Sequence, residues 1–73
     1  MSSSFHLGKY RISPFVRPAH DGRFIGAVSI QSGRGQASHD RVMRFAPTFD
    51  TAQQALRFAT QQGQLQAQHW LAA

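Results

Sequence analysis

The chain contains no cysteine, no glutamate and no long apolar run, and each absence narrows what the protein can be. Without cysteine it has no disulfide and none of the usual structural zinc sites, which fits a reducing compartment. No apolar stretch approaches the about 20 residues that a membrane-spanning helix needs. The first residues also lack the apolar core of a signal peptide. The sequence therefore predicts a soluble cytoplasmic protein with no membrane partner.

Acidic residues are scarce throughout. The 73 residues include 8 Lys and Arg but only 3 acidic residues, all Asp, and the formal net charge is +5. Such an excess favours polyanionic partners, either nucleic acid or an acidic protein surface, and it also keeps a small domain soluble. A chain of this length forms a single domain with room for one sheet and one helix.

The longest periodic segment predicts a helix from about Thr51 to Leu71. Thr51 and Gln54 have the spacing of a capping box, which marks a helix start. Gly63 either ends the helix at Gln62 or lies within it, and the unbroken phase of the apolar stripe favours the interior position. The stripe is dominated by small residues, which let a helix approach a sheet closely. Its members are Ala52, Ala55, Leu56, Ala59, Gly63, Ala67 and Trp70.

Strand-like alternation precedes the helix in three segments. The first contains Pro14, which cannot donate to a strand ladder and therefore predicts an edge strand or a bulge. Asp21 and Gly22 suit a tight hairpin turn after it. The strands are residues 10–17, 23–31 and 40–45, within a meander over residues 5–49, and residues 1–4 are predicted to be disordered. The predicted fold is α+β, a three-stranded antiparallel sheet in β-β-β-α order with one C-terminal helix packed on one face.

The DG turn at Asp21 and Gly22 and the T-x-x-x-A pattern from Thr51 to Ala55 are shared with known small domains. With these residues, the chain resembles a family of small, uncharacterised bacterial proteins over residues 10–70. It is also similar to the partial double-stranded-RNA-binding-domain fold of HicB-type antitoxins. The resemblance implies the same core, three strands followed by one helix.

The titratable side chains do not form a recognisable catalytic or metal-binding pattern. Asp21 and Asp50 have turn and helix-cap roles, which leaves one carboxylate without a structural assignment. The four histidines are widely spaced, and no two have the i and i+4 separation that would share a metal on a helix. The sequence predicts a protein that is not an enzyme, with no catalytic residue, cofactor, metal or small-molecule substrate.

Two candidate surfaces correspond to two classes of function. Phe58 and Leu65 lie on one side of the predicted helix, away from the core stripe, which favours a protein-interaction module whose partner is either a second copy or another protein. The alternative is a nucleic-acid-binding module, because guanidinium and aromatic groups on an open sheet face suit phosphates and stacked bases. The candidate residues for that function, including one in a glycine-rich loop that could bind phosphate, are Arg11, Phe15, Arg17, Arg44 and Arg34.

Overall fold

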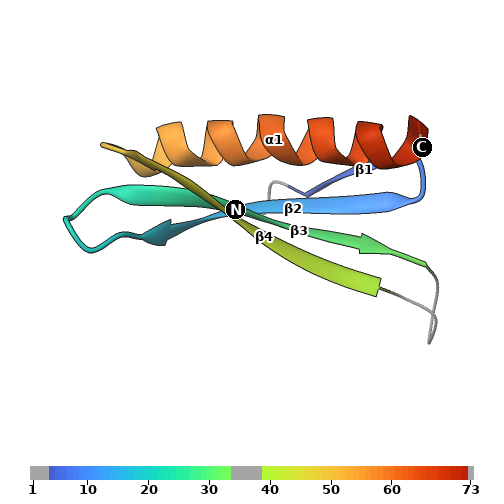
Figure 1. The fold of residues 1–73 in the computed structure, drawn as a ribbon, viewed down its shortest axis with the longest axis horizontal. Coiled ribbons are helices and arrows are strands. Elements are labelled where there is room, and N and C mark those ends of the chain that lie inside the picture. The colour runs from blue at the N-terminus through green and yellow to red at the C-terminus, as the bar shows by residue number, and fades with distance from the viewer. Residues whose placement is uncertain (1–3, 34–38, 73) are drawn as a thin grey trace.

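The computed structural model describes residues 4–33 and 39–72, which form one antiparallel sheet and one helix (Figure 1). The strands follow one another across the sheet in chain order, and the helix lies along one face while the other face stays uncovered. The elements are β1 Phe5–Leu7, β2 Tyr10–Pro18, β3 Phe24–Ser32, β4 His39–Phe49 and α1 Ala52–Ala72. The predicted α+β class and the C-terminal helix are confirmed.

The sheet has four strands, so the prediction of three is wrong. The additional strand is β1, in which Phe5 pairs with Ile12 and Leu7 pairs with Tyr10. Gly8 begins the connecting turn with a φ of 59°, a conformation that glycine adopts without steric cost. A strand of three residues is too short to display a period of two, so its pattern could not identify it. Its pairing with β2 and its apolar contacts with the core hold it in place.

Pro14 lies in β2 beyond the last residue that pairs with β1, where that side of β2 has no neighbouring strand. At Pro14, β2 is therefore a sheet edge, as the sequence predicted. A residue without an N–H is tolerated at such an edge. The first three residues of β2, in contrast, pair with both β1 and β3.

Strand β4 continues to Phe49, whereas the sequence predicted an end at Phe45. The pairing with β3 is irregular opposite Gly26 and then resumes, with Thr48 beside Ile25. Pro47 falls within the irregular part, where the ladder is already interrupted, so it does not end the strand.

The core lies between α1 and strands β2 and β3. Ile12 and Val28 are completely buried beneath the helix. Gly63 lies inside α1, as the phase of the stripe predicted, and a β-carbon there would be 2.8 Å from Cγ2 of Val28. The small-residue stripe is therefore what allows α1 to lie so close to the sheet. Its buried members are Ala55, Ala59, Gly63 and Ala67.

Candidate interaction surface

Strand β4 is the outermost strand of the sheet and has 11 residues. Among the residues that the structure describes it pairs with β3 alone, so its other side presents backbone N–H and C=O groups without a strand partner there. All of its residues are exposed or half-exposed. A long free edge of this kind is able to bind a further strand.

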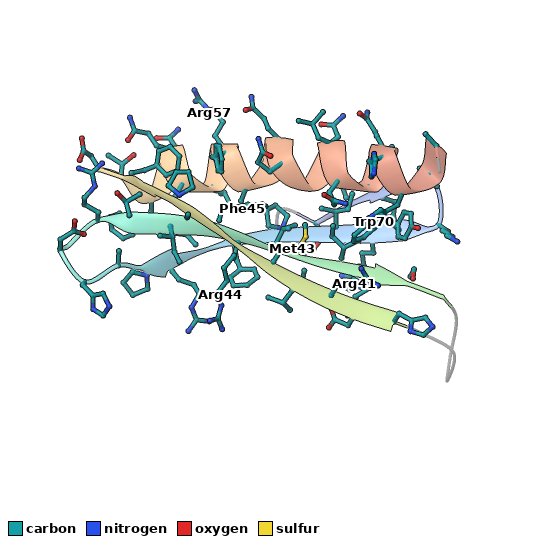
Figure 2. All side chains as sticks on the ribbon, in the orientation of Figure 1. Arg41, Met43, Arg44, Phe45, Arg57 and Trp70 are labelled. Atoms are coloured by element: carbon teal, nitrogen blue, oxygen red, sulfur yellow. The ribbon has the colours of Figure 1, made fainter. Side chains whose placement is uncertain are left out.

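Helix α1 covers little of β4. Figure 2 shows Met43 and Phe45 pointing toward the helix side of the sheet, but both side chains remain half-exposed. The main contact comes from Phe58, whose ring centroid lies 5.5 Å from that of Phe45 and 5.2 Å from that of Phe49. Phe58, predicted from sequence as an interaction residue, thus packs against β4 within the same molecule.

The second predicted interaction residue, Leu65, is 57% exposed. It follows Phe58 by two helical turns and so lies on the same side of α1. Val42 on the strand is 55% exposed. We define the β4 surface as this edge with its helical border, comprising Asp40, Arg41, Val42, Met43, Arg44, Phe58 and Leu65.

Four of the residues predicted to bind nucleic acid share the open face of the sheet. Phe15 and Arg44 are both in register with Ala27, one from each neighbouring strand. Arg11 and Arg17 lie on the same side of β2 as Phe15, because side chains alternate along a strand. Figure 2 shows Arg44 pointing away from α1.

Ala27 is completely buried although it points away from the helix, so its neighbours on the open face cover it. Among the described residues the one ion pair joins Arg23 to Asp50 at 3.0 Å, which leaves the arginines of the open face without an acidic partner. Arg34, the remaining predicted residue, lies outside the described residues.

A shallow hollow of about 350 Å³ lies at the end of the sheet near the C-terminus of α1. It is built around Trp70, whose ring lies 5.6 Å from the ring of Tyr10 and 5.3 Å from the guanidinium of Arg41. Trp70 is half-buried, and its contact with Arg41 was not anticipated because the two residues are distant in sequence. The other lining residues are Ile30, Ser32 and His39.

Sequence reasoning also overlooked Asp40 and Val42. The Asp40 carboxylate accepts a hydrogen bond of 2.8 Å from the Ser29 hydroxyl. The available signal was the alternation of Asp40, Val42 and Arg44, which places these side chains on one face of a strand. Its meaning depends on the free edge that β4 presents along its whole length.

The described parts of the chain contain neither a cluster of metal-ligand side chains nor a helix suited to span a membrane. No group of three or more His, Cys, Asp or Glu side chains in residues 4–33 and 39–72 is arranged to hold a metal ion. Within the same ranges, no helix combines the length and the apolar character that crossing a bilayer requires.

Comparison with protein-family models, with curated proteins and with solved structures finds no significant match for this chain. The resemblance to HicB-like domains therefore stays a prediction. The fold and its exposed surfaces define a small α+β domain with a free sheet edge and an open basic face.

Proposed function

We propose that the protein is a non-enzymatic interaction module that self-associates through the β4 surface. The proposal rests on one observation, an outer strand of 11 residues whose edge is free and whose inner side α1 leaves half-exposed. Backbone hydrogen bonds to a further strand would satisfy the edge. Burial of the exposed Val42 and Leu65 side chains would supply the apolar contribution.

A second copy is the partner to which the proposal commits. Identical strands pair antiparallel about a twofold axis, so one surface serves both copies and the assembly closes at two. The β4 surface also carries an acidic and a basic side chain on the same face, which an identical strand can match.

The test is sedimentation of the purified chain over a wide concentration range. We expect a monomer–dimer equilibrium. Leu65→Ser should weaken the association of the dimer by about tenfold, because the variant lacks the leucine side chain that the dimer would bury. Leu71→Ser is the matched control, since Leu71 is 44% exposed and lies on the other side of α1, beside Gly8. A wild-type chain that remains monomeric, or equal weakening by both variants, would contradict the proposal.

Binding of single-stranded nucleic acid on the open sheet face is the second candidate function. The observation that favours it is the row formed by Phe15, Ala27 and Arg44, with Arg11 and Arg17 on the same face. An aromatic ring can stack on a base while guanidinium groups bind phosphates. Arg44 belongs to both candidate surfaces, so the two functions compete for its side chain.

A further inference from the structure

We infer that two copies pair through β4 in one register, in which Val42 lies opposite Val42 of the second copy and Asp40 lies opposite Arg44. This inference rests on the proposed self-association and specifies how it is achieved. It follows from the order of charges along β4, where Asp40 and Arg44 are placed symmetrically about Val42. The strand is therefore complementary to an antiparallel copy of itself.

The three side chains share one face of the sheet. Asp40, Val42 and Arg44 are in register with Gln31, Ser29 and Ala27, which alternate along β3 in the same way. Directly opposed residues in an antiparallel pair have β-carbons about 4.5–5.5 Å apart, within reach of a carboxylate and a guanidinium. A twofold axis at Val42 therefore produces two ion pairs between the copies.

The other face of β4 is compatible with the same axis. There the pairing sets Arg41 opposite Met43 of the second copy, and no like charges meet. Moving the axis to Arg41 or to Arg44 would place two arginines directly opposite each other, which is unfavourable. Moving it to Met43 would set Arg44 opposite Val42 and remove both ion pairs. Among these registers, only the one centred on Val42 pairs Asp40 with Arg44 and sets no like charges opposite each other.

The helix provides an independent observation. A twofold axis perpendicular to the sheet keeps both helices on the same face. The β-carbon position of Gly63 abuts Val28, and Val28 is in register with Met43, so this part of α1 lies level with the proposed axis. Leu65 is two residues from Gly63 and lies on the same side of α1 as Phe58, whose ring packs against β4. The axis that pairs the charges thus also sets the two exposed Val42 side chains opposite each other on the open face, while the exposed Leu65 side chains of both copies lie on the helix face.

The hydrogen bond from Ser29 holds Asp40 in position for this pairing. Its 2.8 Å contact uses one carboxylate oxygen and leaves the other free for a guanidinium. Arg44 has no ion-pair partner among the residues that the structure describes. The pairing therefore satisfies a charge on each copy without breaking an interaction within it.

The decisive experiment uses Asp40→Arg and Arg44→Asp, each alone and then mixed. In this register each variant alone opposes like charges twice, so its self-association should weaken by about tenfold or more. In the mixture, one chain carries arginine at both positions and the other carries aspartate at both. Every opposed pair then joins opposite charges, so a heterodimer of near wild-type affinity should form. Arg17→Asp makes the same charge change on the open face of β2 and should leave dimerisation and mixing unaffected.

A cross-linking experiment covers the case in which a charge variant folds poorly. The chain has no cysteine, so Val42→Cys introduces a single thiol that should lie opposite its copy and oxidise to a cross-linked dimer. Thr48→Cys, on the same face of β4 but far from the axis, should not. A wild-type monomer would overturn self-association itself. A wild-type dimer in which the mixture gives no heterodimer, or in which Val42→Cys does not cross-link, would overturn this register and leave the proposed function standing.

Discussion

The β-carbon position of Gly26 lies 2.5 Å from the carbonyl oxygen of Ala55, so α1 rests on β3 at a point where the strand has no side chain. That separation is shorter than a non-bonded contact allows, and the obstructing atom belongs to the helix backbone. Gly26→Ala should therefore displace α1 and lower the free energy of unfolding by about 1–3 kcal/mol, as overpacked cores do. Urea denaturation measures this loss.

Gly63→Ala is the comparison at the same interface. Its new methyl group would meet side-chain atoms of Val28 and Ile12, which can shift further than backbone. Alanine also gains about 1 kcal/mol over glycine within a helix, which offsets part of the strain. Gly26→Ala should thus be the more damaging substitution, and the reverse order would contradict the close approach at Ala55.

Trp70→Ala tests whether the end of α1 contributes to the core. Trp70 packs against Tyr10 and Arg41 and is half-buried. Truncation of a large aromatic residue in a core costs about 3–5 kcal/mol, and the half-exposed ring should give a smaller loss of about 2 kcal/mol in thermal or urea unfolding. Arg41→Ala removes only the cation–π contact and should cost below about 1 kcal/mol. Unchanged stability of Trp70→Ala would mean that the last turns of α1 do not stabilise the fold.

Binding of a single-stranded oligonucleotide, followed by fluorescence anisotropy at several salt concentrations, tests the open sheet face. If the face binds, affinity should fall by about 0.7 log units per log unit of salt for each phosphate neutralised. Phe15→Ala should lose about 1–3 kcal/mol of stacking energy, and Arg17→Ala should flatten the salt dependence. Arg57→Ala, an exposed change on the helix, should do neither. If none of the three changes affects binding, the open face holds no specific site, and the basic charge attracts the oligonucleotide only diffusely.

The features that could be predicted from the sequence are those determined by neighbouring residues. The cap of α1 is one example, since the amide of Gln54 donates to the Thr51 hydroxyl at 3.2 Å. The DG turn is another, where Gly22 has a φ of 78° and the amide of Arg23 donates to Asp21 at 3.2 Å. Alternation also assigned Phe15 and Arg44 to the face away from the helix. The helix cap, the turn and the alternation each depend on backbone geometry over a few residues. The residue types within such a short segment are enough to specify that geometry.

The remaining features depend on pairings between distant segments. Met43 and Phe45 have the pattern of core residues, and only the position of β4 at the outer edge, beyond the narrow stripe of α1, leaves them half-exposed. Strand β1 forms because it pairs with β2 and packs against the core. The pattern of three residues does not indicate these distant contacts. The alignment of Phe15 and Arg44 beside Ala27 follows from the register of three strands. Local preferences set the elements, whereas strand order and helix placement are set by the apolar area that the whole chain can bury.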